Sequence, residues 1–229
     1  MTGFSEKDMP QRYGPWARIV NAALVFGISV LLLAAPARAE TKKIVVLGDS
    51  LTAGLGLDAR DAFPAKLEAA LKAKGRDVRV IGAGVSGDTT AGGRTRLAWA
   101  LSSAGAGGPD GVIVELGAND GLRAIDPKAT RANLTAILAE LKNRKIPTLL
   151  TGMRAPPNLG AQYQVQFDTI FSLLAVQHDV VFYPFFLEGV AAVPALNQDD
   201  AIHPNAKGVE EIVRRILPYV LKLLDKPRE

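Results

Sequence analysis

Cysteine is absent from the 229-residue sequence, and histidine occurs only twice, as His178 and His203. Without cysteine there are no disulfide bonds and no lipid attached to an N-terminal cysteine. No group of His, Cys, Asp and Glu has the spacing of a metal site. No cluster of Lys and Arg with interleaved aromatic residues indicates a nucleic-acid surface. The absences therefore predict neither a metal cofactor nor a nucleic-acid partner.

The net charge of the part of the chain that is expected to fold is also small. The formal net charge is +4, and +2 of it precedes Glu40, so the remainder carries about +2. The isoelectric point near 9.4 consequently says little about polyanionic partners.

The first 39 residues have the pattern of an export signal. The apolar run Ile19–Ala35 follows Arg12 and Arg18, and it ends in an A-x-A site at Ala37 to Ala39. A basic flank, an apolar core and small residues at a cleavage site come in this order in secretory signals. We predict cleavage after Ala39, a mature domain over residues 40–229, and a periplasmic or secreted protein.

Two alternatives at this end stay open. The apolar run is near the lower length limit for crossing a bilayer, so an uncleaved anchor is the competing interpretation. The small-residue site favours cleavage, after which no stable membrane insertion is expected. Met9 is a second candidate start, since it would leave a more basic flank.

The rest of the chain alternates short apolar runs with helical patterns, which predicts an α/β fold. Strands are expected over residues 44–47, 77–81, 112–116, 148–151 and 180–183. Helices are expected over residues 61–74, 90–102, 127–144 and 163–177, and from Pro204 onward. This alternation with short connections predicts one domain built on a five-stranded parallel sheet with helices on both faces.

The segment KIVVLGDSLTAG organises the functional prediction. Its apolar run ends at Gly48 and Asp49, so the hydroxyl of Ser50 is expected where a buried parallel strand emerges into solvent. Open α/β sheets bind their ligands at that edge. A nucleophilic serine needs a base, an acid that orients the base, and donors for the oxyanion.

His203 is the candidate base. It lies in the polar segment NQDDAIHPN, three residues after Asp200, whose carboxylate can orient the ring. Asp199 could do the same, although the spacing favours Asp200. A helix cap followed by a solvated imidazole would also explain the pair. His178 falls at the end of a predicted helix, where a cationic or capping role is expected.

The oxyanion donors are expected from three segments that follow predicted strands. Asn119 lies in GAND and can donate its amide, although Asn is also a common turn residue. Gly87 and Ser50 can donate backbone N–H groups.

Two glycine-rich segments resemble nucleotide sites only superficially. GAGVSG, residues 82–87, matches G-x-G-x-x-G but does not follow the first strand and does not lead directly into a helix. GDSLTAG lacks the lysine of a phosphate-binding loop. It also differs from G-x-S-x-G, the motif that carries the nucleophilic serine in another class of hydrolases. We therefore expect no nucleotide cofactor.

Four segments together resemble the sequence blocks of the GDSL or SGNH hydrolases. They are GDSLTAG at 48–54, SGDT at 86–89, GAND at 117–120 and DAIHPN at 200–205. The surrounding sequence is similar to the exported bacterial acyl-CoA thioesterase, lysophospholipase and arylesterase group. The resemblance covers essentially the whole mature chain. Ala118 replaces the family's usual glycine, a small change that should leave the turn intact.

This resemblance implies a fold and a set of roles. The fold is a three-layer, flavodoxin-like sandwich without metal or nucleotide. The catalytic residues are Ser50, Asp200 and His203, and the oxyanion donors are Ser50, Gly87 and Asn119. The implied activity is hydrolysis of a small-molecule acyl ester or thioester through an acyl-enzyme, by a protein expected to be a monomer.

The substrate is less constrained than the reaction. Apolar loop residues predict a medium or long acyl chain, and they are Leu51, Leu55, Leu57, Leu122, Pro156, Pro157 and Leu159. A carbohydrate O-acetylesterase is the alternative, for which only Trp99 and Tyr163 offer sugar-stacking surface. A non-catalytic lipid- or glycan-binding module on the same fold is the alternative from another class.

Overall fold

The computed structural model describes residues 41–227 as a single parallel sheet enclosed by helices. The predicted signal peptide, its cleavage site and Met9 lie outside the described residues. The strands are β1 (Lys42–Gly48), β2 (Val78–Gly84), β3 (Gly111–Val114), β4 (Thr148–Thr151) and β5 (Val181–Tyr183). Their order is β2-β1-β3-β4-β5, and every neighbouring pair is parallel. The five-stranded parallel sheet expected from the sequence is therefore confirmed.

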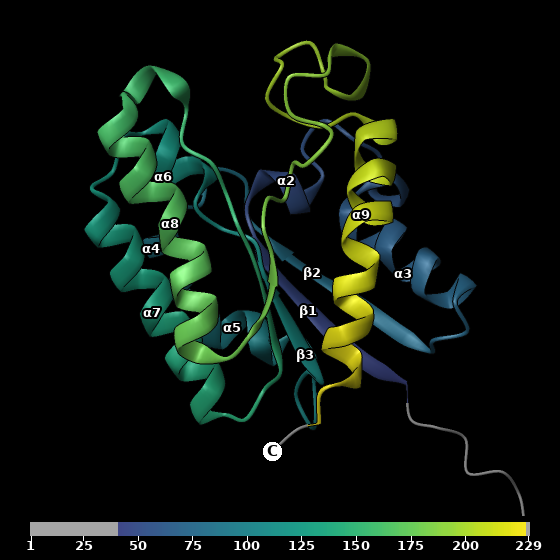
Figure 1. Cartoon of the computed structure of the whole chain (residues 1–229). Coiled ribbons are helices and arrows are strands. Elements are labelled where there is room, and N and C mark those ends of the chain that lie inside the picture. Colours follow the sequence, from purple (N-terminus) through teal and green to yellow (C-terminus); the bar gives the residue numbers. More distant parts are fainter. Residues whose placement is uncertain (1–40, 228–229) are drawn as a thin grey trace, which may run out of the picture. The chain divides into compact units, whose positions relative to one another are not determined.

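Helices cover both faces of this sheet, which gives the three layers visible in Figure 1. One face packs against α3 (Phe63–Ala73) and α9 (Ala206–Asp225). The opposite face packs against α4 (Thr90–Thr95), α5 (Leu97–Ser102), α7 (Pro127–Asn143) and α8 (Ala161–His178). The short helices α2 (Ser50–Ala53) and α6 (Ala118–Leu122) follow β1 and β3, and three 3₁₀ turns lie at Ala59–Asp61, Pro157–Leu159 and Pro194–Leu196.

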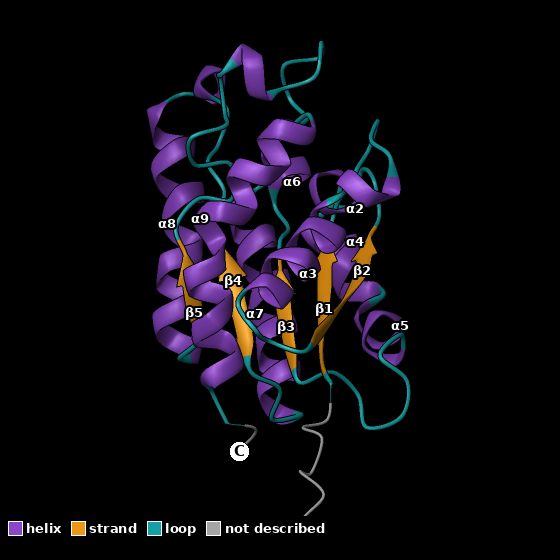
Figure 2. Ribbon diagram, turned by 90° about the vertical axis from the view of Figure 1, so that its right-hand side faces the viewer, coloured by secondary structure: helices purple, strands orange, loops and turns teal. Residues whose placement is uncertain are grey.

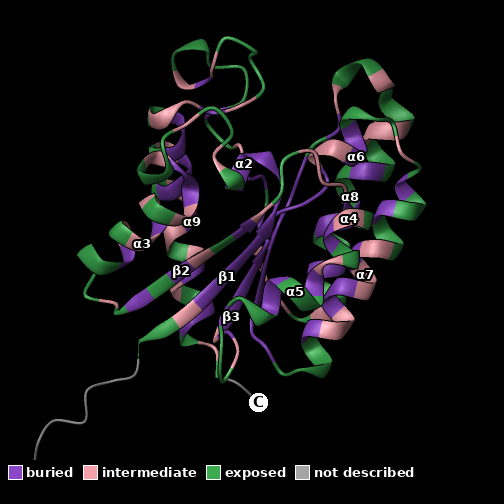
Figure 3. Cartoon of the chain, turned by 180° about the vertical axis from the view of Figure 1, so that it is seen from behind, coloured by how far each residue is buried: buried purple, intermediate pink, exposed green. Residues whose placement is uncertain are grey.

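The core lies where apolar strand and helix residues meet. Ile44, Val45, Val46 and Leu47 of β1 are completely buried, as expected for a strand covered on both faces. Figure 3 shows this burial across the central strands. Each fully buried large aliphatic side chain contributes roughly 1.5–3 kcal/mol relative to an exposed one. Burial of this run fixes the position and direction of the segment that ends at Ser50.

Several element boundaries differ from the predictions, as in β3, which ends at Val114 rather than at residue 116. The expected helix over 90–102 is two helices, because regular structure breaks at Arg96, which ends α4 and precedes α5. Helix α3 begins at Phe63 rather than Asp61, because the Asp61 carboxylate pairs with Lys66 instead of capping the helix. Strand β2 extends to Gly84, which carries the second polar segment farther along the sheet.

All five strands point the same way, so their carboxyl ends share one edge of the sheet (Figure 2). The segments that follow β1, β2, β3 and β5 contain Ser50, Gly87, Asn119 and His203 respectively. The topology therefore gathers the predicted site residues at a single edge. Within residues 41–227, no helix combines the length and the apolar character that crossing a membrane requires.

Candidate active site

A tight turn holds the candidate nucleophile. Asp49 caps α2 by accepting the Leu51 N–H at 3.0 Å, so Ser50 becomes the first residue of the helix with 8% of its surface exposed. A Cβ atom at Gly48 would lie 2.1 Å from the Thr52 hydroxyl, which explains why glycine occupies this position. The end of β1 and the cap together aim Ser50 at the carboxyl edge of the sheet.

His203 joins Ser50 to Asp200 through an unbroken hydrogen-bond chain. Its Nε2 lies 2.9 Å from the Ser50 Oγ, across 153 residues of sequence. Its Nδ1 lies 2.6 Å from Asp200 Oδ2. The structure therefore brings together the three residues that the sequence proposed as nucleophile, base and orienting acid.

Backbone donors fix the Asp200 carboxylate. Asp200 Oδ1 accepts the N–H groups of Ile202 and His203, each at 2.9 Å. The His203 N–H, the His203 ring and the Ile202 N–H lower the pKa of Asp200 to about 2. Asp200 is therefore ionised at neutral pH. Of the two candidate aspartates, Asp200 contacts the ring, as the spacing predicted.

Asn119 ties the short helix α6 to the turn that contains Gly87. Asn119 Nδ2 donates to the Asp88 carbonyl at 2.9 Å and to Asp49 Oδ2 at 3.2 Å. Gly87 has a φ of +83°, which favours glycine, and its carbonyl accepts from Arg123 at 2.9 Å. Both hydrogens of the Asn119 amide thus have protein acceptors, and donation to a substrate oxygen requires one of them to be shared.

Arg96 braces the turn that contains Gly87 and was not identified from the sequence. Its guanidinium donates to the Gly48 carbonyl at 2.6 Å and also to the Ala83 carbonyl and the Asp88 carboxylate. It therefore links the ends of β1 and β2 to the turn that contains Gly87. A single arginine in a predicted helix reads as a solvated charge, so no sequence signal pointed to this role.

A pair of buried carboxyl groups, Asp49 and Glu115, adjoins the nucleophile. Glu115 follows β3, is completely buried, and accepts the Asp49 N–H at 3.4 Å. Burial, together with the charge of Asp49, raises the pKa of Glu115 well above its usual value. Burial raises the pKa of Asp49 to about 6, although the Leu51 N–H and the Asn119 amide oppose the shift. In the sequence, the one signal for this pair is Glu115, a charged residue at the end of an apolar run that predicts a strand.

His178 does not belong to the site. It ends α8, which precedes β5, so it lies toward the opposite edge of the sheet from Ser50. Of the two roles expected there, the cationic one is disfavoured, because burial and nearby Lys142 lower the pKa of His178. Its Nε2 is buried and finds no partner among the described residues.

A largely apolar cavity of about 560 Å³ opens beside Ser50, Asn119 and His203. Leu51, Leu122, Pro156 and Pro157 line it as expected, whereas Leu55, Leu57 and Leu159 do not. Further walls come from residues that the sequence analysis did not name, and they are Met153, Phe185, Leu187, Ala191, Ala192 and Ile202. Most of these belong to the apolar segment after β5. The cavity can therefore hold a hydrophobic group next to the Ser50 hydroxyl.

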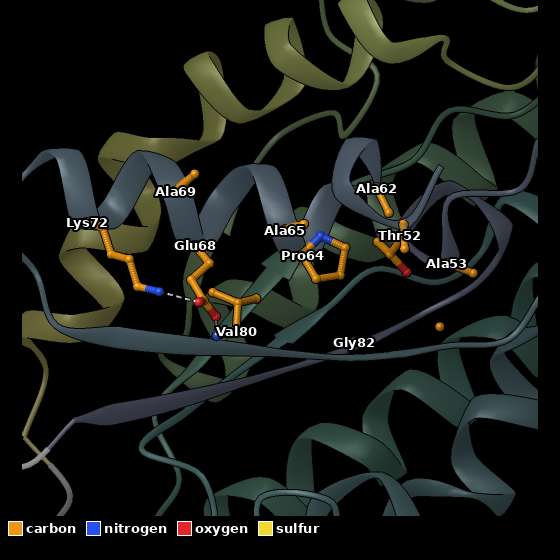
Figure 4. A pocket seen from close by; sticks show the side chains of 12 residues that line it. Thr52, Ala53, Ala62, Pro64, Ala65, Glu68, Ala69, Lys72, Val80 and Gly82 are labelled. Carbon is orange, nitrogen blue, oxygen red and sulfur yellow. Dashed lines mark hydrogen bonds and ion pairs between the residues drawn. The ribbon is translucent and has the colours of Figure 1, made fainter. Parts of the chain in front are cut away.

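A separate hollow between α3 and the edge strand β2 contains none of the triad residues (Figure 4). There Glu68 accepts the Val80 N–H at 2.8 Å and pairs with Lys72 at 2.5 Å. An edge strand exposes unpaired backbone donors, and a charged side chain placed on them discourages pairing with another chain. This hollow is best explained as protection of the sheet edge.

The geometry of the site agrees with the comparison to known families. A model of the GDSL-like lipase/acylhydrolase family matches residues 46–210. The chain belongs to this family. The resemblance recognised in the sequence is therefore confirmed, and the protein is a serine hydrolase that acts on carboxylic ester or thioester bonds.

Several relatives of this GDSL-family hydrolase cover most of its length. Esterase TesA of Pseudomonas aeruginosa is 36% identical over 206 residues, 90% of this chain and 100% of that protein. Thioesterase 1/protease 1/lysophospholipase L1 of Escherichia coli is 41% identical over 80% of this chain and 84% of that protein. The crystal structure of AlinE4, an SGNH-hydrolase family esterase, is 51% identical and superposes with a TM-score of 0.69 over 83% of this chain and 100% of that chain.

Proposed function

We propose that Ser50 is the nucleophile of this hydrolase and that His203 and Asp200 complete its catalytic triad. The proposal is supported chiefly by two contacts of the His203 ring. Nε2 lies 2.9 Å from Ser50 Oγ, and Nδ1 lies 2.6 Å from Asp200 Oδ2. His203 Nε2 accepts the Ser50 proton as Oγ attacks the acyl carbon, and returns it to the leaving oxygen or sulfur. Water then hydrolyses the acyl-enzyme by the same proton path.

The negative oxygen formed in each step needs donors. We assign this role to the backbone N–H groups of Ser50 and Gly87 and to the Asn119 amide. The hydrogen bond from Asn119 to Asp49 is the longer of its two, at 3.2 Å against 2.9 Å. Asn119 therefore shares that hydrogen with the oxyanion while its bond to the Asp88 carbonyl keeps the amide in place.

The acyl group of the substrate occupies the cavity beside Ser50. Its volume of about 560 Å³ and its lining of Leu, Met, Pro and Phe fit a medium or long hydrocarbon chain. Each methylene transferred from water into such a cavity contributes about 0.8 kcal/mol. The names of the relatives, which include an esterase and a lysophospholipase, are compatible with such substrates.

A carbohydrate O-acetylesterase is less well supported. Trp99 is 59% exposed, but it belongs to α5, at the opposite edge of the sheet from the site in Figure 1. The Tyr163 hydroxyl donates to the Ile125 carbonyl, and its ring stacks on Phe167. Neither residue lines the cavity, so the aromatic surface that a sugar would need is not supplied by them.

The cellular setting is also part of the proposal. The signal pattern over residues 1–39 supports export to the periplasm or beyond, followed by cleavage after Ala39. The mature enzyme would then work as a monomer on small acyl esters or thioesters, with no cofactor.

A chain-length series tests the substrate assignment. Hydrolysis of p-nitrophenyl esters from acetate to palmitate, and of CoA and lysophospholipid esters, should give kcat/KM values that rise from acetate to a maximum at a medium or long chain. Leu122→Trp narrows the cavity and should lower kcat/KM for the preferred chain at least tenfold, about 1.4 kcal/mol, with little change for acetate.

Leu55→Trp is the matched control. Leu55 and Leu122 are 47% and 54% exposed, and only Leu122 lines the cavity. The control should behave like the native enzyme with every chain length. A maximum at acetate, or equal effects of the two substitutions, would refute the acyl-chain assignment.

A further inference from the structure

Glu115 is a completely buried carboxyl group for which the proposed mechanism has no use. It directly follows β3, and its backbone N–H continues the sheet by donating to the Leu47 carbonyl at 2.8 Å. Its Oε2 accepts the Asp49 N–H at 3.4 Å, while Oε1 has no partner within the described part of the chain. An isolated buried carboxylate is costly, so the position needs an explanation.

Among the described residues, Asp49 is the one carboxyl group that acts on Glu115. Both side chains are fully buried, and two negative charges this close together in an apolar setting repel strongly. Asp49 has the better donors, since Oδ1 accepts from Leu51 at 3.0 Å and Oδ2 from Asn119 at 3.2 Å. The negative charge therefore resides on Asp49, and the proton on Glu115.

Asp49 connects this pair to the reacting groups. Its backbone immediately precedes Ser50, its Oδ1 caps the helix that Ser50 begins, and its Oδ2 holds the Asn119 amide. A shift of the Asp49 carboxylate would thus displace both the nucleophile and one oxyanion donor. Displacements of about 1 Å in such groups lower rates by about a hundredfold.

We propose that Glu115 is a positioning residue of the active site, which presents a neutral carboxyl group to Asp49 and thereby fixes the Ser50 turn and the Asn119 amide. The inference rests on the proposed function, because it presupposes that Ser50 and Asn119 act in ester hydrolysis. Glu115 itself touches no substrate. Its contribution is to accept the Asp49 N–H and to keep Asp49 stationary.

Two substitutions separate this role from simple packing. Glu115→Gln keeps the shape and neutrality of a protonated glutamate and offers an amide N–H to Asp49, so kcat should stay within about threefold of native. Glu115→Leu fills similar space but leaves the Asp49 N–H without an acceptor, and kcat should fall at least tenfold. KM should change less than threefold in both, because neither substitution alters the acyl cavity.

Asp49→Asn tests the same link from the other partner, and it keeps the proposal testable if Glu115→Leu does not fold. It places an amide donor where Asn119 now finds an acceptor, so kcat should fall at least tenfold. Thr151→Val is the control for loss of a buried polar group at this sheet edge. The Thr151 hydroxyl is buried, donates to the Val114 carbonyl at 3.3 Å, and has no contact with Asp49.

The experiment measures kcat, KM and thermal unfolding for the mature enzyme and these variants, together with the rate at which a fluorophosphonate labels Ser50. The inference predicts slow labelling and low kcat for Glu115→Leu, and near-native values for Glu115→Gln and Thr151→Val. Near-native kcat in Glu115→Leu, or an equally large loss in Glu115→Gln, would overturn it. Absence of Ser50 labelling and ester turnover in the native enzyme would instead refute the proposed function.

Discussion

At the scale of single residues, the site depends on how firmly the His203 ring is oriented. Asp200 holds Nδ1 at 2.6 Å and is itself held by two backbone N–H groups. Asp200→Asn replaces the acceptor with an amide that no longer enforces the required tautomer. Because the Asp200 side chain is 45% exposed and water can partly substitute, we expect kcat/KM to fall about 10- to 100-fold.

The ionised state of Asp200 can be tested directly. The pKa of Asp200 is lowered to about 2, so the carboxylate stays charged from pH 4 upward. The side-chain carboxyl carbon of Asp200, assigned in an NMR spectrum by its loss in Asp200→Asn, should therefore show no titration between pH 4 and 9. Asp199→Asn is the control, and it should leave that signal in place and retain near-native activity. Titration of the Asp200 signal above pH 4 would contradict the ionised state assigned to Asp200.

Glu115 should also affect stability. Its pKa is raised in the folded protein, so as pH rises above the usual glutamate value the unfolded chain releases a proton that the folded chain keeps. This one group then lowers the free energy of unfolding by about 1.4 kcal/mol per pH unit until the folded-state pKa is reached.

Glu115→Gln lacks this titration. Its free energy of unfolding, measured with urea over a series of pH values above the usual glutamate pKa, should exceed that of the native protein by a margin that grows with pH and then levels off at the folded-state pKa of Glu115. Thr151→Val, which leaves every titrating group in place, should run parallel to the native curve. A constant difference between Glu115→Gln and the native protein would show that Glu115 titrates normally.

The sequence predicted the reacting residues more successfully than it predicted the residues that support them. Ser50, Asn119 and His203 each follow a strand in a recognisable polar segment. Arg96, by contrast, acts through contacts to the Gly48 and Ala83 carbonyls that only the folded sheet creates. The role of Glu115 likewise depends on Asp49, which is 66 residues away in the sequence.

At the scale of elements, the segment that carries His203 is held between β5 and α9. A short antiparallel bridge joins Asn197 and Pro204, and the Asn205 N–H donates to the Leu196 carbonyl at 2.9 Å. Gly208, in the first turn of α9, packs so closely that a Cβ atom would lie 2.1 Å from the same carbonyl oxygen.

Gly208→Ala should therefore push the segment away from the helix. We expect a loss of roughly 1–3 kcal/mol in the free energy of unfolding, as for other overpacked sites, and a lower kcat because His203 moves with the segment. Gly75→Ala is a control for glycine replacement in general, since nothing lies near its Cβ position, although its φ of +73° adds backbone strain. A native kcat in Gly208→Ala would show that the segment is not positioned by this contact.

Hydrophobic periodicity in the sequence predicted a helix well where only one face of that helix is buried. The stripe of Val209, Ile212, Ile216 and Val220 in α9 is buried as its spacing indicated. Pro218 lies inside that helix without ending it, because α9 continues to Asp225. The break at Arg96 could not be read from the sequence, because it depends on the bonds that the Arg96 side chain makes to β1 and β2.

At the scale of the whole molecule, the sequence makes a prediction about processing. Export and cleavage after Ala39 should leave a chain that begins at Glu40. N-terminal sequencing and intact mass of the protein recovered from an expressing bacterium should show this end. Ala39→Asp should block processing, since a small residue is required there. Recovery of an intact leader on the active native enzyme would contradict the prediction.

The fold class was predictable because five apolar runs alternate with helical patterns, and such a chain has few arrangements available. The part of the cavity wall that comes from the segment after β5 was not predictable, because that segment has no regular periodicity. Its residues Phe185, Leu187 and Ile202 meet the α6 residue Leu122 only once the sheet is formed.

The central claim is that one edge of the sheet activates Ser50 through His203, and active-site labelling tests it most directly. The native enzyme, treated with a fluorophosphonate probe and analysed by intact mass and peptide mapping, should carry one adduct, on Ser50. Ser50→Ala should remain unlabelled and lose at least about a thousandfold in ester turnover, and His203→Ala should label far more slowly. An adduct on another residue, or near-native ester turnover in Ser50→Ala, would contradict the account.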